Sequence, residues 1–287
     1  MSLKCGIVGL PNVGKSTLFN ALTKASIPAE NYPFCTIDPN VGVVPVPDPR
    51  LDRIAAIARP AKVTPAVVEF VDIAGLVAGA SKGEGLGNQF LAHIRETDGI
   101  IDLVRCFEDA NVVHVAGRVD PVADIETVQT ELALADLATV DKVLGRVVPK
   151  ARSGDKEAIR FEGVLARVRE RLNQGKPARS LGLEGGELGL LRPLCLLTTK
   201  PAIYVANVDE RGFTGNPLLD RVREYAASEG APVVAICAAV EAEIAGMSED
   251  DRKAFLADLG LAEPGLDRLI HAAYDLLGLQ TFFTTGP

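Results

Sequence analysis

The chain has 287 residues, of which 47% are hydrophobic and 24% are charged, and its formal net charge is −8. This composition is typical of a globular protein with a sizeable core, in one large domain or two moderate ones, and the acidic balance excludes a protein that coats nucleic acid with its whole surface. The sequence contains neither a run of about 18 apolar residues nor a secretory signal, and its five scattered cysteines lack C-x-x-C spacing. We therefore expect a cytoplasmic protein without a membrane or DNA partner.

The first motif is a complete phosphate-binding loop. Residues 9–17 read GLPNVGKST and match every fixed position of G-x-x-x-x-G-K-[ST], between an apolar strand pattern and a helical one. Gly9 and Gly14 allow the backbone to curl so that N–H groups and the helix N-terminus face a phosphate. The motif predicts that Lys15 reaches the β- and γ-phosphates and that the Ser16 hydroxyl ligates Mg²⁺. The alternative, an accidental glycine turn, does not require all of these positions.

Two further segments fit a nucleotide-dependent switch. Residues 24–40 are polar and interrupted by prolines, which predicts a loop, and Thr36 within it is a candidate Mg²⁺ ligand that closes over the γ-phosphate. A β-branched strand pattern at 66–71 leads directly into Asp72-Ile73-Ala74-Gly75. An acid at the end of a buried strand, followed by a glycine N–H, is typical of the metal and γ-phosphate sensor, so Asp72 and Gly75 are candidate site residues.

The glycine-dense residues 76–88 predict a second switch loop. Many switches place a glutamine directly after D-x-x-G to orient the attacking water, but this chain has Leu76 there. We therefore expect slow intrinsic hydrolysis, or water positioned by another group. Gln89 and His93 lie nearby in the sequence, and His93 is equally well explained as a residue that packs a helix.

The rest of the chain alternates between strand and helix patterns. Strands are expected at 41–46, 99–107, 201–206 and 232–241, the last including its loop, and helical repeats at 121–144 and 158–172. These patterns predict a mostly parallel sheet interrupted by an antiparallel helical hairpin with its bend at 153–155. From Arg146 to Arg179 there are ten Lys or Arg and four Asp or Glu, so the hairpin is locally basic.

The motifs together resemble the YchF (Obg-like) ATPase family of translation-factor-class P-loop NTPases. The resemblance rests on residues 9–17, 33–40, 72–76, 207–210, 258–261 and 278–284. It implies an α/β fold with a Ras-like nucleotide domain, a coiled-coil-like helical insertion, hydrolysis of ATP with Mg²⁺, and association with the ribosome. Carried over by position, it implies that Asn12, Val13, Gly14, Lys15, Ser16 and Thr17 hold the phosphates, that Ser16 and Thr36 hold Mg²⁺, and that Val208 contacts the base.

The resemblance also implies a division of the chain. We expect a discontinuous nucleotide-binding domain at 1–120 and 200–280 and an inserted helical domain at 121–199. Family members carry a C-terminal TGS domain that would begin near residue 281, and the sequence ends at Pro287. It is therefore expected to be either a truncated form or a natural short form.

The base-recognition motif favours ATP over GTP. Guanine-specific relatives use N-K-x-D, whose aspartate accepts hydrogen bonds from guanine, whereas this chain has Asn207-Val208-Asp209-Glu210. Asp209 is one position too early, and we expect Asn207, Val208 and Glu210 to surround the purine. Three functions remain open: a slow ATPase switch on the ribosome or its RNA, contacted through the basic segment 146–179; a GTPase of the same fold; or a nucleotide-regulated binding protein in which turnover is dispensable.

Overall fold

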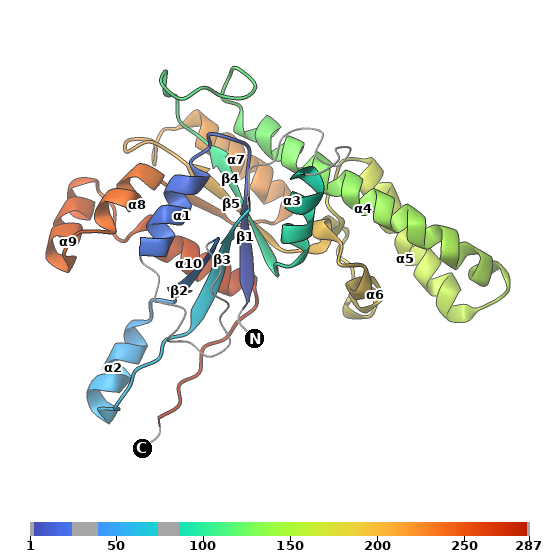
Figure 1. Ribbon diagram of the computed structural model, residues 1–287, viewed down its shortest axis with the longest axis horizontal. Helices are drawn as coiled ribbons and strands as arrows, with labels where there is room; N and C mark the ends of the chain where they lie inside the picture. Colours follow the sequence, from blue (N-terminus) through green and yellow to red (C-terminus); the bar gives the residue numbers. More distant parts are fainter. Residues whose placement is uncertain (1–2, 25–39, 74–85, 286–287) are drawn as a thin grey trace.

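The computed structural model describes residues 3–24, 40–73 and 86–285. These residues contain a six-stranded sheet in the order β2-β3-β1-β4-β5-β6, flanked by helices (Figure 1). Within it, β2 runs antiparallel to its neighbour and the other pairs are parallel, so the expected mostly parallel α/β sheet is confirmed. The strands are β1 (Lys4–Val8), β2 (Val41–Pro45), β3 (Val67–Asp72), β4 (Gly99–Arg105), β5 (Ala202–Asn207) and β6 (Val233–Ile236).

The helices follow the strands in chain order and include the predicted hairpin. They are α1 (Lys15–Lys24), α2 (Pro49–Ala58), α3 (Leu86–Arg95), α4 (Pro121–Arg152), α5 (Lys156–Asn173), α6 (Gly185–Leu191), α7 (Pro217–Glu229), α8 (Ala238–Ile244), α9 (Glu249–Asp258) and α10 (Gly265–Leu276). Short 3₁₀ turns lie between α5 and β5: η2 (Ala178–Leu181), η3 (Arg192–Leu194) and η4 (Leu197–Thr199). In the described ranges, no helix combines the length and the apolar character needed to cross a membrane.

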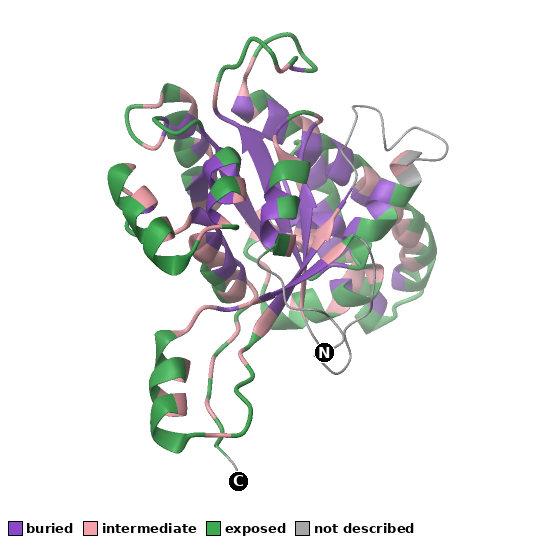
Figure 2. Ribbon diagram, turned by 60° about the vertical axis from the view of Figure 1, so that its left-hand side comes forward, coloured by how far each residue is buried: buried purple, intermediate pink, exposed green. Residues whose placement is uncertain are grey.

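The sheet is buried on both faces because successive side chains of a strand point to opposite sides. In β5, Ile203 and Val205 belong to the larger core, which also contains side chains of α1, α3 and α10. Tyr204 and Ala206 belong to a second core with α7. Figure 2 shows this arrangement as a central band of buried strands with helices that are exposed on their outer sides.

The long helix α4 has local signals at both ends. The Asp120 side chain accepts a hydrogen bond from the Ala123 N–H, and Pro121 occupies the first turn, where its missing N–H costs nothing. The bend after α4 contains Gly154 with φ +91°, and Asp155 then caps α5. With 32 residues, α4 is about 48 Å long. The predicted antiparallel hairpin is therefore confirmed, with ends set by these caps.

The hairpin has a hydrophobic core of its own. Its buried side chains come from α4, α5 and the turns that follow, including Val140, Leu165 and Val168. The first turns of α4 pack elsewhere, since Ile125 and Val128 belong to the two cores at the sheet. The insertion is thus anchored on the sheet at its base and held together by its own apolar contacts further out (Figure 1).

Several element boundaries differ from the sequence prediction: the strand expected at 99–107 ends at Arg105, and the helix expected at 121–144 continues to Arg152. The last strand ends at Ile236, and residues from Ala238 onward form α8 rather than a loop. The Ala238 N–H donates to the Asn207 side chain, a contact between distant segments that no local pattern reveals. Helix α3 begins at Leu86, inside the stretch predicted as a switch loop.

Candidate functional site

The phosphate loop lies between β1 and α1 and adopts a conformation that requires its glycines. Gly9 has φ +150° and Gly14 has φ +99°. A Cβ atom would lie 2.4 Å from the Leu103 carbonyl oxygen at Gly9 and 2.3 Å from the Asn207 Nδ2 atom at Gly14. Asn12 also has a positive φ of 64°, a conformation that asparagine tolerates better than most residues. Any larger residue at Gly9 or Gly14 is therefore disfavoured both by close packing and by the positive φ.

Lys15 and Asp72 form the charged part of this site. The Lys15 Nζ atom lies 3.4 Å from the Gly9 carbonyl oxygen, which folds the side chain back over the loop. Burial lowers the pKa of Lys15, and the negative charge of Asp72 opposes that shift. Burial likewise raises the pKa of Asp72, with Lys15 acting in the opposite direction. Each charge thus stabilises the other at the carboxyl ends of β1 and β3.

Asp72 also fits a metal site. Its Oδ1 atom is buried and has no hydrogen-bond partner among the residues that the structure describes. Ser16 lies in the first turn of α1, next to Lys15. A hydroxyl and a carboxylate oxygen are the hard donors that Mg²⁺ prefers, and this ion usually takes only one or two protein ligands beside phosphate and water. The predicted positions therefore suit Mg²⁺.

Asn207 connects the phosphate loop to the opposite half of the site. Its Nδ2 atom donates to the Val13 carbonyl oxygen at 2.9 Å, and its Oδ1 atom accepts from the Ala238 N–H at 3.0 Å. The side chain is 4% exposed. The sequence predicted a contact with the purine, whereas the described contacts of Asn207 join β5 to the phosphate loop and to the start of α8.

A pocket of about 390 Å³ opens beside Asn207 at the carboxyl ends of β4, β5 and β6. It is lined by residues that follow these three strands: Phe107, Glu108, Asp109, Asn207, Val208, Asp209, Glu210, Arg211, Cys237 and Ala239. Val208 is 2% exposed and donates its N–H to the Ile236 carbonyl oxygen. The Asp209 carboxylate accepts from the Arg211 N–H at 3.1 Å, so it closes its own turn. Edges of parallel sheets where adjacent loops diverge are common ligand sites.

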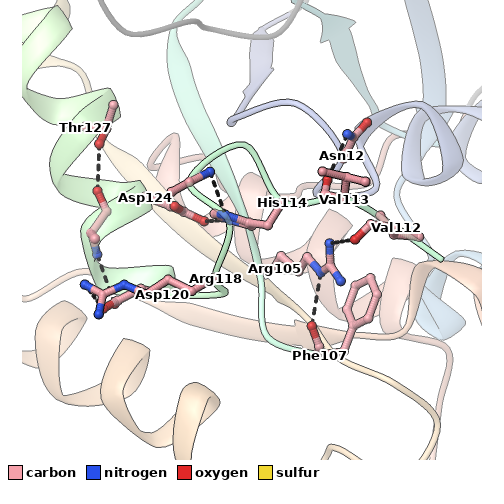
Figure 3. A network of polar contacts seen from close by, with 12 residues as sticks. Asn12, Arg105, Phe107, Val112, Val113, His114, Arg118, Asp120, Asp124 and Thr127 are labelled. Carbon is pink, nitrogen blue, oxygen red and sulfur yellow. Dashed lines mark hydrogen bonds and ion pairs between the residues drawn. The ribbon is translucent and has the colours of Figure 1, made fainter. Parts of the chain in front are cut away.

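Sequence reasoning missed Arg105, which organises the wall of this pocket. Its side chain is 1% exposed, and its guanidinium donates to the carbonyl oxygens of Phe107 and Val112 at 3.1 and 2.9 Å (Figure 3). It also donates to the Asp109 carbonyl oxygen at 3.2 Å. The same group lies 4.7 Å from the centre of the Phe107 ring. The available signal was a charged residue at the end of an otherwise apolar strand, because such a residue is buried only when its donors are satisfied.

The loop after β4, which forms this wall of the pocket, is tied to the phosphate loop and to the base of α4. The Asn12 side-chain amide donates to the Val113 carbonyl oxygen at 3.0 Å. His114 is buried, accepts the Ala116 N–H at Nδ1, and therefore donates from Nε2 to the Asp124 carboxylate at 2.9 Å (Figure 3). Residues on both sides of the pocket are thus linked to the first turn of the inserted helix.

The structure places most, but not all, of the predicted site residues. Thr36, Gly75 and Leu76 lie outside the described residues. Gln89 and His93, considered as alternatives for orienting water, are exposed on α3. The structure brings together Asn12, Val13, Gly14, Lys15, Asp72 and Asn207, with Val208 and Glu210 on the adjoining pocket.

Comparison with known proteins gives consistent matches. Residues 4–142 match the family model described as 50S ribosome-binding GTPase. The ribosome-binding ATPase YchF of Haemophilus influenzae is 60% identical over 287 residues, which cover 100% of this chain and 79% of the relative. The protein of that name from Bacillus subtilis is 52% identical over 289 residues, with the same coverage.

Solved structures agree with these sequence matches. The structure of the Schizosaccharomyces pombe YchF GTPase has a TM-score of 0.86 and 36% identity, covering 99% of this chain and 78% of that one. A GTP-binding protein from Pyrococcus horikoshii has a TM-score of 0.56 at 20% identity, covering 96% of this chain and 78% of that one, and supports the fold alone. The fold, the phosphate loop and the full-length identity together show that this chain belongs to the YchF family of P-loop nucleotide-binding proteins.

Proposed function

We propose that this protein is an ATP-binding and ATP-hydrolysing switch that requires Mg²⁺ and associates with the ribosome. The proposal of ATP rather than GTP rests on the pocket beside Asn207. Position 208 is a buried valine instead of lysine, position 210 is glutamate instead of aspartate, and the Asp209 carboxylate is engaged by its own turn. The hydrogen bonds that favour guanine in N-K-x-D proteins therefore lack their usual acceptor in this motif.

The phosphate side of the site supports the proposed chemistry. In this proposal residues 12–17 hold the phosphates, and Lys15 supplies the cation at the β- and γ-phosphates. Ser16, Thr36 and Asp72 hold Mg²⁺, which when bound neutralises charge on the phosphates, and the Gly75 N–H contacts the γ-phosphate. Turnover is proposed to be slow because Leu76, next to that glycine in the sequence, has no group that can orient water.

The nucleotide can be tested directly by calorimetric titration with ATP and GTP in the presence of MgCl₂ and then of a chelator. We expect ATP to bind at least as tightly as GTP and both affinities to fall without Mg²⁺. A preference for GTP above about tenfold, or about 1.4 kcal/mol, would contradict the proposal. That result would favour GTP, the nucleotide for which the related Schizosaccharomyces pombe YchF GTPase is named.

A matched variant sharpens this test. Glu210→Asp combined with Val208→Lys restores the N-K-x-D pattern and should shift the ratio of affinities toward GTP. Because the Val208 side chain is buried, the unfolding free energy of this variant must be measured in parallel. Glu210→Asp alone, at an exposed position, is the control that leaves the core unchanged.

For the ribosome contact we propose the inserted domain, residues 121–199, set into a nucleotide-binding domain at 1–120 and 200–280. Four arginines of the basic segment 146–179 already have partners: Arg167 pairs with Glu187, Arg169 with Asp141 and Arg179 with Glu229, and Arg171 donates to Ser180. Among the other cations of the segment, Lys150, Arg152 and Lys156 lie next to the bend, are exposed and form no ion pair among the described residues, so we propose these for contact with RNA phosphates. The relatives named as ribosome-binding support ribosome association and a cytoplasmic location.

A further inference from the structure

A second cavity, of about 520 Å³, lies away from the nucleotide site, between α3, α4 and η3. Its α4 wall consists of residues 135, 138, 139, 142, 143 and 146, a spacing that follows one face of a helix. From Ala135 to Arg146 this face is about 16 Å long. Leu91 of α3 and Leu194 of η3 complete the cavity, which we call the α3/α4 groove.

Six of the residues that line the α3/α4 groove are hydrophobic, and we call them its floor. Its hydrophobic lining residues are Leu91, Ala135, Ala138, Val143, Pro193 and Leu194. Ala135 packs against the larger core at the sheet, whereas Val143 and Leu194 pack against the core of the hairpin. The groove therefore crosses the junction between the two cores, and anything seated in it would touch both.

The polar lining is entirely cationic or neutral. Arg95, Lys142 and Arg146 line the groove together with Thr139, and no Asp or Glu is among the lining residues. None of the three cations forms an ion pair within the described parts of the chain.

One nearby carboxylate, that of Asp136, interacts electrostatically with Arg95. Asp136 is 1% exposed and already accepts hydrogen bonds from the backbone N–H groups of Leu197 and Thr198 and from the Thr198 hydroxyl. On a chain with a net charge of −8, three cations without an ion-pair partner among the described residues are thus grouped around this floor.

We propose that the α3/α4 groove is a docking site for an acidic amphipathic segment of a partner protein. Apolar side chains of the segment would cover the floor, and its carboxylates would meet Arg95, Lys142 and Arg146. A helix of about 11 residues matches the length of the groove, which corresponds to helix-in-groove recognition. Nucleic acid fits the cations but not the floor, because a phosphate backbone offers no apolar surface to bury there.

The location of the groove couples this docking site to the nucleotide site. Helix α3 is the first described element after the D-x-x-G motif at residues 72–75, and α4 carries the inserted domain. Figure 1 shows α3 beside the first half of α4. A partner that contacts both helices would bind with an affinity that depends on their relative position. The inference does not depend on which purine the protein prefers.

The probe for this site is a fluorescein-labelled helical peptide of about 12 residues, with leucines at helical i, i+3 and i+4 spacing and glutamates beside them. Its binding to the full chain is followed by fluorescence anisotropy. A peptide with lysine at each glutamate position and a single-stranded RNA oligonucleotide are the competitors. The groove variants are Lys142→Glu with Arg146→Glu, and separately Ala138→Trp, which fills the floor without changing charge. The matched control is Lys150→Glu with Lys156→Glu, an equal charge change nearer the bend.

We expect saturable binding of the acidic peptide, a loss of at least about tenfold in both groove variants, and a change of less than about twofold in the control. Absence of saturable binding up to about 1 mM peptide would overturn the proposal. An equal loss in the groove and control pairs would also overturn it, by showing general attraction between opposite charges. Displacement of the peptide by the RNA, with RNA binding lost in the groove variants, would assign the groove to nucleic acid instead. Urea unfolding of each variant excludes loss of the fold.

Discussion

At the scale of single residues, Arg105 shows how one buried side chain can shape a binding pocket. It satisfies three carbonyl oxygens of the loop that supplies Phe107 and Asp109 to the pocket beside Asn207. The tip of the loop buries little surface, since Glu108, Asp109 and Ala110 are all exposed, so its conformation rests on hydrogen bonds such as these. The affinity of the pocket for its ligand should therefore depend on a residue buried behind its wall.

Arg105→Met should lower both the free energy of unfolding and nucleotide affinity. It removes a donor from three part-buried carbonyl oxygens, of which only that of Asp109 keeps another among the described residues, the Val112 N–H, and an unsatisfied buried group costs about 1–3 kcal/mol before relaxation. Urea denaturation and calorimetry measure the two effects. The control is Arg118→Met, which removes an arginine that is 79% exposed and should change stability by less than about 0.5 kcal/mol. Equal effects of the two substitutions would mean that Arg105 does not organise the loop.

Lys15→Ala should abolish tight nucleotide binding and leave the fold intact. The substitution removes the side-chain cation of the phosphate loop and a single long hydrogen bond, of 3.4 Å to the Gly9 carbonyl oxygen. It also leaves Asp72 without its opposing charge, so the pKa of Asp72 should rise further. Calorimetry with ATP and with GTP checks the affinity. Unchanged binding of both nucleotides would refute the phosphate-loop assignment.

At the scale of elements, the central strand β4 carries an acid in an apolar position. Asp102 is 2% exposed, its Oδ1 atom has no partner among the described residues, and burial raises its pKa to about 8. Arg179 opposes this shift, whereas Asp124 and Glu229 add to it. A pKa of about 8 predicts that the Asp102 carboxyl group is mainly protonated at neutral pH.

This strand should make stability depend on pH. Between about pH 4 and about pH 8 the unfolded chain releases the Asp102 proton while the native protein keeps it, so the free energy of unfolding should fall as the pH rises. Asp102→Asn removes the titrating group and should flatten that slope. Urea denaturation of both proteins at several pH values across this window is the measurement. Parallel slopes would mean that Asp102 is ionised in the native state.

The bend of the hairpin formed by α4 and α5 should contribute to ribosome binding. Lys150→Glu with Lys156→Glu should weaken sedimentation with purified ribosomes and reduce its salt dependence, because phosphate contacts release counterions. Reversing Arg167, Arg169 and Arg171 is a poorer test, since these side chains hold the hairpin and the turns after it together. Arg53→Glu with Lys62→Glu, at exposed positions near α2, is the matched control. If the bend variant and the control variant reduce sedimentation equally, the bend of the hairpin is not a specific ribosome contact.

At the scale of the whole molecule, the nucleotide site joins segments from both ends of the described chain. The phosphate loop, the loop after β4 and the turns after β5 and β6 meet around Asn207 and the pocket beside it. The hairpin is inserted between these segments in the sequence and is tied to them through Asp124 and His114. A ligand in this site should therefore stabilise the native sheet as a unit.

ATP with Mg²⁺ should raise the unfolding temperature of the whole protein. At a ligand concentration about a hundred times the Kd, the gain in stability is about 2.7 kcal/mol. Calorimetric melting with and without ATP and MgCl₂ measures the shift, and Lys15→Ala is the control that should show none. A shift confined to one of two separate transitions would show that the hairpin unfolds independently of the nucleotide domain.

Much of the site follows from local pattern. The phosphate loop is contiguous, and its glycine spacing, strand and helix could be recognised without any tertiary information. The acid at the end of β3 and the hairpin with its bend at Gly154 were predicted for the same reason. The start of α8 was not, because its first N–H is satisfied by Asn207, 31 residues earlier in the chain.

By itself, the sequence determined the α/β fold class, the phosphate loop and the absence of the N-K-x-D lysine and aspartate, since each depends on residues close together in the chain. Only the tertiary structure decided that Asn207 bridges Val13 and Ala238, that Arg105 supports the pocket wall, and that Arg169 is engaged by Asp141. The physical reason is that burial and pairing depend on which distant segments pack together. A charged residue looks the same in the sequence whether it faces water, a carbonyl group or an opposite charge.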